Sequence, residues 1–450
     1  MSGYLLHDEA TLSQIARDAV CRARRSGFDQ AVCVAREFAG LTIKVKNGVP
    51  ETAVRDGGQS VSVTVFDGGR TGTATTSTLT TQAVQTAVER AIAIARQVES
   101  DAAAGCADSE WLARDGRDVE LYAPSGLPAA DIAAAAKAIE DAAIDASATQ
   151  PARVMEAGAV SQDSRWARAI GADFCRAASA SSQSRWCVAI AERDGAMNRA
   201  AWRSAERRTD RLAPPQAIGA TAVALAARKL GARAVKTQAA PVLLDATIAG
   251  SLVREFCGGL FGAPQHQKST FLADAIGQRV LASHLDLVED PFEPFGMASG
   301  GCDSEGVAGM HRFVVREGVV EDYFLSSRWA RKLGRRSTGN ADGTWNLFLT
   351  SRTTTNGDDL AGMLRRLGRG LWVTEFLGGR CDPVTGTYSK AVAGFWVEDG
   401  EAAFPVQDVT IAGELATMLD HIRFVGADVY RDGAVRTGSI LLGDMKIAGR

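Results

Sequence analysis

Hydrophobic residues recur at helical spacing in two stretches near the start of the chain. Residues 8–25 carry one apolar stripe, and residues 80–97 carry another. The members of the first stripe are Leu12, Ile15, Ala16, Ala19 and Val20. Apolar positions three and four residues apart are typical of an amphipathic helix that packs on a core. The sequence therefore predicts helices over 8–25 and 80–97.

Between these helices the pattern changes to the alternation of a strand. Residues 60–66 (SVSVTVF) alternate small polar residues with Val and Phe, which is a period of two. Asp67-Gly68-Gly69 then has the composition of a hairpin turn. Further strands are predicted over 31–38, 41–46, 51–55 and 70–76. Strands joined by short turns form an antiparallel meander, which favours an α+β fold over a doubly wound sheet.

The middle of the chain repeats this combination of helices and strands. Alanine-rich helices are predicted over 127–148 and 213–231. Strands are predicted over 152–160, 164–169 and 185–192. The low-complexity run AASASSQS at 177–184 resembles a linker in composition, but we interpret it as a strand at the edge of a sheet.

From about residue 235 onward glycine and aromatic residues become more frequent, and short strand-like segments alternate with turns. Strands are predicted over 311–316, 319–326, 345–349, 371–377, 391–398, 403–406 and 439–447. This pattern is typical of a compact barrel or sandwich. We therefore expect an α+β fold: an N-terminal antiparallel sheet with helices, followed by a β-rich, barrel-like C-terminal domain. The expected domains are 1–105, 106–234 and 235–450.

The composition argues against some classes of binding partner and indicates a cellular compartment. The 450 residues include 46% hydrophobic residues, 50 basic and 53 acidic residues, for a net charge of −3. Balanced charge gives no general attraction to nucleic acid or to an anionic membrane. The eight cysteines form no CxxC pair, so neither a zinc knuckle nor a disulfide framework is indicated. With no recognisable signal peptide or membrane span, we expect a cytoplasmic protein.

The functional interpretation depends on one stretch, SLVREFCGGLFG at residues 251–262. It follows a buried-looking strand at 241–245 and is predicted to be a short helix that runs into two glycines. A zinc peptidase places two His on one face of such a helix beside a Glu that acts as general base. Glu255 is present, but the flanking positions hold Arg254 and Gly259. Arginine stays protonated and glycine has no side chain, so neither can ligate a metal ion.

This stretch resembles the corresponding segment of the TldD/PmbA family. TldD-like members carry His-Glu-x-x-x-His there and bind zinc, whereas PmbA-like (TldE-like) members lack the histidines. Arg254 and Gly259 fall on the two His positions, and Glu255 on the Glu. TldD-like members take a third ligand from a Cys near the C-terminus, but the last cysteine here is Cys381. The resemblance therefore implies the PmbA branch, with no catalytic residue and no metal held by this chain.

The resemblance covers most of the chain. Residues 57–78 resemble a strand pair of the family, and Asp303-Ser304-Glu305-Gly306 resembles its Asp-Asp-Glu-Gly element except at Ser304. Residues 372–400 resemble a PmbA-like run, in which Asp382, Thr387 and Lys390 replace Asn, Asp and Arg. The resemblance implies a heterodimer with a TldD-like subunit that holds zinc and degrades or processes peptides. The name "modulator of DNA gyrase" used in this family does not indicate DNA binding.

Within that run, Gly378, Gly379, Tyr388 and Ser389 are candidate peptide contacts. Extended peptides commonly bind by adding a strand to a sheet edge, and glycine allows two backbones to approach closely. Tight β turns are the alternative explanation for these glycines. Without zinc, Glu255 has no activated water on which to act. We therefore expect it to form an ion pair with Arg254 or another basic residue, with Arg254 substituting for the charge of the metal ion.

Two groups of side chains suggest other chemistry. His266 and His284 precede Asp286, Glu289 and Asp290, so a different metal site is conceivable. No two histidines have the spacing of helical zinc ligands, however, and we interpret 284–294 as a solvated acidic loop.

Cys257 and Cys302 lie in glycine-rich surroundings but not in a nucleophile elbow. We interpret them as packing thiols. Residues 328–336 hold five basic residues and a Trp, which makes this segment a candidate for binding nucleic acid. A substrate-contacting or solvated loop is the preferred interpretation.

Three functions remain open from the sequence. The first is a subunit without zinc in a peptide-degrading complex with a TldD-like partner. The second is a peptide-binding or scaffolding protein that has no peptidase partner. The third is a free-standing hydrolase with an unrecognised site. A homodimer is expected to be possible when the chain is alone.

Overall fold

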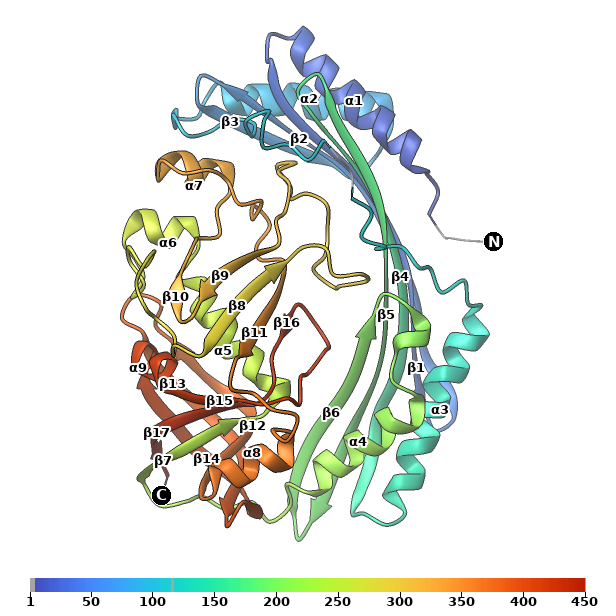
Figure 1. The fold of residues 1–450 in the computed structure, drawn as a ribbon. Coiled ribbons are helices and arrows are strands. Elements are labelled where there is room, and N and C mark those ends of the chain that lie inside the picture. Colours follow the sequence, from blue (N-terminus) through green and yellow to red (C-terminus); the bar gives the residue numbers. More distant parts are fainter. Residues whose placement is uncertain (1–4, 115–116, 450) are drawn as a thin grey trace.

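A long, curved antiparallel sheet organises the molecule, with helices on its outer face and the C-terminal domain on its inner face (Figure 1). The computed structural model describes residues 5–114 and 117–449. The sheet has the strand order β3-β2-β1-β4-β5-β6. Its strands are β1 (Gln30–Lys46), β2 (Val49–Asp67), β3 (Arg70–Thr76), β4 (Ala152–Ile170), β5 (Phe174–Arg193) and β6 (Ala196–Glu206).

The first two expected domains contribute to this one sheet. β1 pairs with β4 in antiparallel register from Val32↔Ile170 to Val45↔Ala157. The expected division between residues 105 and 106 therefore separates strands that are hydrogen-bonded neighbours. The predicted meander of β1, β2 and β3 is confirmed, as is the hairpin turn between β2 and β3. The run 177–184 lies within β5, as predicted.

The strands are longer than the sequence pattern predicted. Segments 31–38 and 41–46 form the single strand β1, and 51–55 and 60–66 lie within the single strand β2. The glycines between these segments suggested breaks between strands. In the structure they allow neighbouring side chains to pack closely against the strand backbone. A Cβ on Gly58 would lie 2.8 Å from the Phe38 ring, and one on Gly40 would lie 2.8 Å from an Asp56 carboxylate oxygen. Glycine in a strand often marks such a close approach.

Four helices cover the outer face of the sheet (Figure 1). They are α1 (Glu9–Arg25), α2 (Thr81–Ala95), α3 (Ala129–Ser147) and α4 (Pro215–Ala227), which confirms the four predicted helices. α1 begins where the Asp8 side chain accepts a hydrogen bond from the Thr11 amide, an N-cap. Its stripe of Leu12, Ala16 and Val20 is buried in one core cluster with the residues of β1 and β2 that face the helices.

The C-terminal domain contains a five-stranded sheet and a barrel, which confirms the barrel-like expectation. The sheet has the order β10-β9-β8-β11-β16, and pairing of β14 with β17 closes the ring β14-β13-β12-β7-β17. The bounds are β7 (Gln238–Leu244), β8 (Leu285–Asp290), β9 (Arg312–Arg316), β10 (Val319–Val320), β11 (Asn346–Ser351), β12 (Gly370–Cys381), β13 (Thr387–Glu398), β14 (Glu401–Glu414), β15 (Ile422–Val425), β16 (Val435–Arg436) and β17 (Ile440–Ala448). The helices are α5 (Ala246–Gly258), α6 (Gly262–Gln267), α7 (Ser327–Lys332), α8 (Leu360–Leu367) and α9 (Leu415–Asp420), and a 3-10 turn spans Thr209–Arg211.

Two predictions about the strands of this domain are wrong. Residues 284–294 are not simply an acidic loop, because they contain β8, in which Leu285, Leu287 and Glu289 are buried. The acidic side chains suggested a solvated loop, but every second residue of this strand is buried. The strand predicted over 319–326 is limited to Val319–Val320.

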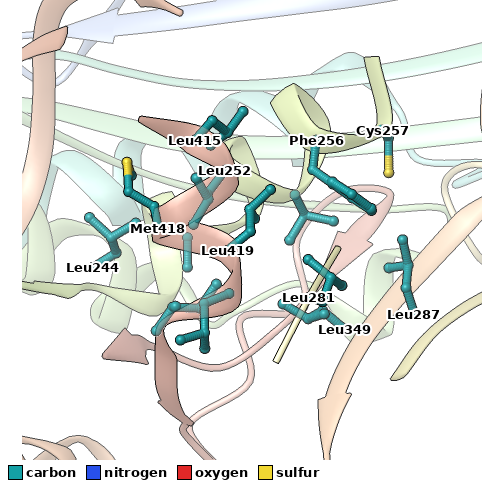
Figure 2. Close-up of a cluster of buried hydrophobic side chains, with 14 of the residues drawn as sticks. Leu244, Leu252, Phe256, Cys257, Leu281, Leu287, Leu349, Leu415, Met418 and Leu419 are labelled. Atoms are coloured by element: carbon teal, nitrogen blue, oxygen red, sulfur yellow. The ribbon is translucent and has the colours of Figure 1, made fainter. Parts of the chain in front are cut away.

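Helix α5 lies in the main core of this domain (Figure 2). Leu252, Phe256 and Cys257 of α5 share one buried cluster with Met418 and Leu419 of α9. This packing fixes the helix that carries Glu255. Among the described residues, no helix has both the length and the apolar character needed to cross a membrane.

The basic segment 328–336 joins the C-terminal domain to the segment that follows α2. Arg331 donates to the carbonyl oxygens of Ala103 at 3.1 Å and Cys106 at 2.5 Å, and it pairs with Asp108 at 2.7 Å. The interpretation of this segment as a solvated loop is wrong for its first half but agrees with residues 334–336, which are exposed and not helical, and substrate contact stays a prediction. Its first half is α7, and the charges of α7 are largely neutralised within the chain.

Candidate functional site

Helix α5 begins immediately after β7 and brings Glu255 to the border of the core. The Asp245 side chain caps the helix by accepting a hydrogen bond from the Thr247 amide at 3.0 Å. Val253 and Phe256 face the core, Arg254 is exposed, and Glu255 is half-buried. The predicted short helix running into two glycines is confirmed.

The cation beside Glu255 is Lys390. The Lys390 Nζ lies 2.6 Å from Glu255 Oε1, and the two side chains are 15% and 22% exposed. Arg254 does not substitute for a metal ion here, because its side chain is exposed and no contact joins it to Glu255 among the described residues. The expectation of an ion pair with another basic residue is the one that holds. Lys390 reaches Glu255 from β13 of the barrel, at a position where the PmbA-like pattern has Arg.

Tyr388 and Cys381 complete this group. Tyr388 is 1% exposed, and its hydroxyl has no partner among the described residues. Lys390 Nζ lies 5.6 Å from the centre of its ring. Burial, and then the charge of Glu255, raise the pKa of Tyr388 far above its usual range. Cys381 lies directly opposite Tyr388 in the β12–β13 register.

These four side chains do not form a catalytic nucleophile. Burial first, and the charge of Glu255 second, raise the pKa of the Cys381 thiol, and Lys390 opposes this only in part. A protonated thiol is a poor nucleophile. The second carboxylate oxygen of Glu255 and the Tyr388 hydroxyl are both buried without a hydrogen-bond partner in the part of the chain that the structure describes. The group therefore offers one free acceptor and one free hydroxyl beside an ion pair.

The predicted peptide contacts Gly378, Gly379 and Ser389 lie at the far end of the β12–β13 ladder. Gly378 and Gly379 are exposed. Gly379 has φ +99°, and a Cβ there would lie 2.3 Å from the Ser389 carbonyl oxygen, so the backbone requires glycine. β12 pairs with β7 only over Leu371–Val373, which leaves the rest of that edge open. Such an edge suits strand addition, and the contact itself stays a prediction. Because Tyr388 is buried, a peptide would reach it only if neighbouring side chains moved.

Arg254 and Gly259, which the sequence resemblance assigns to the two His positions of TldD-like members, do not fit zinc. Arg254 cannot lose its proton at neutral pH. A Cβ on Gly259 would lie 2.7 Å from Thr270 Oγ1 and 3.0 Å from Leu272 Cδ1, so the space that a ligand side chain needs is filled. The described residues contain no group of three or more His, Cys, Asp or Glu side chains arranged to hold a metal ion.

The alternative metal candidates are engaged in other contacts. His284 uses Nδ1 with Ser351 Oγ at 2.8 Å and Nε2 with the Ile422 carbonyl oxygen at 2.9 Å. Glu289 is fully buried and pairs with Arg312 at 2.9 Å. The His266 ring lies against Trp329, with centres 5.8 Å apart.

The other sequence candidates for a nucleophile differ in environment: Cys257 lies in the core of the C-terminal domain, whereas Cys302 is half-buried with its Sγ 3.9 Å from Arg168 Nη1. Cys257 is 2% exposed. Burial raises the pKa of both thiols. Both therefore stay protonated, and Cys257 is a packing thiol as interpreted from the sequence.

A cavity of about 1130 Å³ lies between the inner face of the long sheet and loops of the C-terminal domain. Sequence reasoning missed it because its lining comes from segments far apart in the chain. Strand residues of β1, β4 and β5 form one side, and residues 298–303 and 342–345 form the other. The cavity is large enough for several residues of an extended peptide.

Asp303 of the Asp-Ser-Glu-Gly element shapes the lining of this cavity. Its carboxylate accepts hydrogen bonds from the amides of Glu305 at 2.9 Å, Val307 at 2.9 Å and Ala341 at 3.0 Å. It is 1% exposed, and burial raises its pKa to about 7 despite these hydrogen bonds. The element resembling the family motif is therefore a tight turn that joins two loops of the cavity.

Comparisons with known proteins agree with this geometry. Residues 237–449 match the PmbA/TldA metallopeptidase C-terminal domain, and residues 36–95 match domain 1 of the same family. The chain is 33% identical to the metalloprotease PmbA of Escherichia coli O157:H7, over 95% of this chain and 97% of that protein. It is 31% identical to a PmbA homologue of Haemophilus influenzae, over 98% and 97% of the two chains.

Solved structures share the fold. A Bacteroides thetaiotaomicron protein named for modulation of DNA gyrase aligns with a TM-score of 0.90 at 22% identity, over 99% of this chain and 100% of that chain. TldE from Thermococcus kodakarensis aligns with a TM-score of 0.80 at 17% identity, over 98% and 100%. Full-length similarity above 30%, the two matched domains and the shared fold lead to one conclusion: the chain belongs to the PmbA/TldD family of metalloprotease-like proteins.

Proposed function

We propose that this chain is the subunit without zinc of a PmbA/TldD-type metalloprotease complex that degrades or processes peptides and unfolded small proteins in the cytoplasm. A TldD-like partner would hold the zinc and supply the catalytic groups. This chain would bind no cofactor, and it would supply walls and strand edges around the peptide.

The observation that carries this proposal is the site on α5. Glu255 is retained, but its neighbour is the ammonium group of Lys390 at 2.6 Å instead of a metal ion. A general base of a zinc peptidase acts on a water that the metal activates. A glutamate in an ion pair has no such water, so the helix is suited to a structural role.

Support for peptide binding comes from the cavity and from open strand edges. The cavity of about 1130 Å³ borders the inner face of β4 and β5. The far half of β12 pairs on one side only. Strand addition uses main-chain hydrogen bonds, so it accepts peptides of many sequences.

Support for a partner subunit comes from β2. Residues 61–67 of β2 pair with β3, whereas residues 49–60 have β1 as neighbour on one side only. Val49 and Val54 in that half are 61% and 49% exposed. Long exposed edges are usually covered in native assemblies. We propose that a TldD-like subunit covers this edge, with self-association as the outcome when the chain is alone.

Metal content and peptidase activity test the proposal directly. The purified chain is expected to contain no stoichiometric zinc and to cleave no unfolded peptide. Mixing it with a family member that carries His-Glu-x-x-x-His should give a stable complex whose activity chelators abolish.

Each alternative function has its own outcome. Chelator-insensitive cleavage by this chain alone would replace the proposal with a free-standing hydrolase. Peptide binding without association with any such family member would favour a scaffolding protein. Neither nucleic acid nor a membrane is expected as a partner.

A further inference from the structure

Two arginines stand directly opposite each other on the inner face of the long sheet. Arg168 of β4 and Arg176 of β5 are cross-strand partners, and both line the large cavity. Side chains at such positions have Cβ atoms about 5 Å apart, and like charges there are destabilising. An uncompensated pair of this kind calls for an explanation.

A third arginine adjoins the pair. Arg36 of β1 is opposite Trp166, and Arg168 follows two residues later in β4, so Arg36 and Arg168 are diagonal neighbours on one face. Diagonal neighbours are about 7–8 Å apart, within reach of long side chains. Arg36 is exposed to the cavity and makes no hydrogen bond or ion pair with the described residues.

Among the residues that the structure describes, no carboxylate forms an ion pair with these arginines. Arg168 donates to the Asp303 carbonyl oxygen at 2.5 Å and lies 3.9 Å from Cys302 Sγ. Arg176 donates to the Arg114 carbonyl oxygen at 2.5 Å. Carbonyl oxygens satisfy single N–H groups but do not cancel a positive charge.

The acidic residues of the cavity are engaged elsewhere or stand apart. Those that the structure describes are Glu9, Asp118, Glu120, Asp303 and Asp342. Glu9 accepts from Ser179 Oγ at 2.7 Å, Asp118 from the Glu120 amide at 2.9 Å, and Asp303 from backbone amides. Within the described part of the chain, none forms a salt bridge with the three arginines.

Two buried donors in the cavity lining have no hydrogen-bond partner in the described ranges of the chain. They are Arg168 Nε and Trp345 Nε1. Both can only donate, so the group that satisfies them must be an acceptor. A buried polar group without a partner costs free energy, which makes an acceptor-rich ligand the simplest explanation.

We propose that Arg36, Arg168 and Arg176 form a carboxylate-binding site in this cavity, which takes the C-terminal carboxylate or an acidic side chain of a bound peptide. Guanidinium groups bind carboxylates through paired, charge-assisted hydrogen bonds. β6 pairs with β5 only from Gln183 onward, so the backbone beside Arg176 lies at the edge of the sheet, where an extended peptide can lie. The ligand class rests on the proposed function in peptide processing.

The test compares short labelled peptides of one neutral sequence, titrated into the purified full-length chain by fluorescence anisotropy. One peptide has a free C-terminal carboxylate and one has a C-terminal amide. Two further amidated peptides differ only in an internal Glu or Gln. In at least one of the two pairs, the peptide that carries the carboxylate is expected to bind at least about tenfold more tightly than its uncharged counterpart. A tenfold difference corresponds to one charge-assisted hydrogen bond. The first pair identifies a terminal carboxylate, and the second identifies an acidic side chain.

Variants connect that preference to the arginines. Arg36→Gln is the cleanest, because this side chain has no hydrogen bond or ion pair with the described residues to lose, and Arg176→Gln removes one member of the opposed pair. Both are expected to abolish the preference while the neutral peptide binds unchanged. Arg17→Gln, an exposed arginine on the outer helix α1, removes the same charge far from the cavity and should keep the preference.

Equal binding within both pairs, or a preference that survives Arg36→Gln and Arg176→Gln, overturns the carboxylate site while peptide binding stands. Failure of every peptide to bind also overturns it. The proposed subunit role is judged separately, by zinc content and by assembly with the zinc-binding family member. Thermal unfolding of each variant confirms that it is folded.

Discussion

Lys390 Nζ and Glu255 Oε1 lie 2.6 Å apart, so a strand of the barrel provides the positive charge that faces the glutamate of helix α5. In a zinc peptidase the corresponding glutamate lies beside a metal-bound water. Here the charge belongs to a side chain that is covalently part of the fold. The retained glutamate therefore contributes to how α5 packs against β13.

Removing the ammonium group should destabilise the fold. Lys390→Met keeps the length of the side chain but leaves Glu255 half-buried without its cation. The free energy of unfolding is expected to fall by about 1–3 kcal/mol, measured by urea denaturation. Adding Glu255→Gln to this variant should recover part of the loss, because no unpaired charge remains. A single variant as stable as the wild type would show that the pair contributes nothing.

A side chain at position 259 should destabilise the fold, because neighbouring atoms already fill the space around Gly259. Gly259→Ala places a Cβ 2.7 Å from Thr270 Oγ1, and overpacking of this kind costs about 1–3 kcal/mol. Gly258→Ala is the matched control, because nothing lies within 4 Å of its Cβ position. It should leave stability unchanged or raise it by up to about 1 kcal/mol. Equal melting temperatures for the two variants would contradict the packing argument.

The same reasoning predicts that zinc binding is not restored by replacing the two His positions. An Arg254→His, Gly259→His double variant still lacks a third ligand and must displace Thr270 and Leu272. Metal analysis after dialysis against zinc should find no stoichiometric ion. Tightly bound zinc in this variant would show that the fold is more adaptable than its packing indicates.

Stability should depend on pH through Asp303. Burial raises the pKa of Asp303 from 3.8 to about 7, so between these values the folded chain binds a proton that the unfolded chain releases. The stabilisation is fully present below about pH 4 and is lost as the pH rises through about 7. For this group alone, the free energy of unfolding should fall by up to about 4 kcal/mol over that window.

Denaturation at several pH values in Asp303→Asn checks this. The variant has no group to titrate there, so its stability should fall less steeply with pH than that of the wild type, even though it loses hydrogen bonds to backbone amides. Asp342→Asn changes an exposed carboxylate of the same cavity and should retain the wild-type slope. An Asp303→Asn slope that matches the wild type would exclude the proton uptake.

How much could be predicted from sequence depends on how far apart the interacting residues lie in the chain. Arg254, Glu255 and Gly259 are on one helical segment, so the lack of His at these positions could be recognised directly. Lys390 comes from another element, and the sequence could not choose between it and Arg254 as the cation. The arginines of the cavity could not be grouped, because only the strand register brings Arg168 opposite Arg176.

Predictions from the local sequence pattern differ from the structure where polar residues are buried. β8 carries Asp286 between its two leucines and Glu289 two residues after them, and the ion pair of Glu289 with Arg312 is a tertiary contact that no local pattern reveals. Tyr388 was expected to face a peptide because its neighbours are glycines, yet the barrel buries it. The long strands were divided at glycines whose role is to admit the Phe38 ring and the Asp56 side chain.

The contact between α7 and the segment after α2 should hold two parts of the molecule together. Arg331 is 24% exposed and bonds to the carbonyl oxygens of Ala103 and Cys106 and to the carboxylate of Asp108. Arg331→Ala leaves these acceptors without their donor, and hydrogen bonds to a charged donor contribute about 1.5–3 kcal/mol each. We expect faster amide hydrogen exchange in residues 101–108 and a lower melting temperature. Because both ends of the contact belong to one chain, the rest of the interface keeps the variant folded.

Arg336→Ala is the matched control for this prediction. Arg336 is exposed, lies in the same basic segment and carries the same charge, so loss of charge alone is tested without loss of the contact. Its exchange over residues 101–108 should match the wild type. If Arg331→Ala and Arg336→Ala exchange alike, the contact does not order this segment. If both instead weaken nucleic-acid binding in a filter assay, the basic segment has the function that its ion pairs argue against.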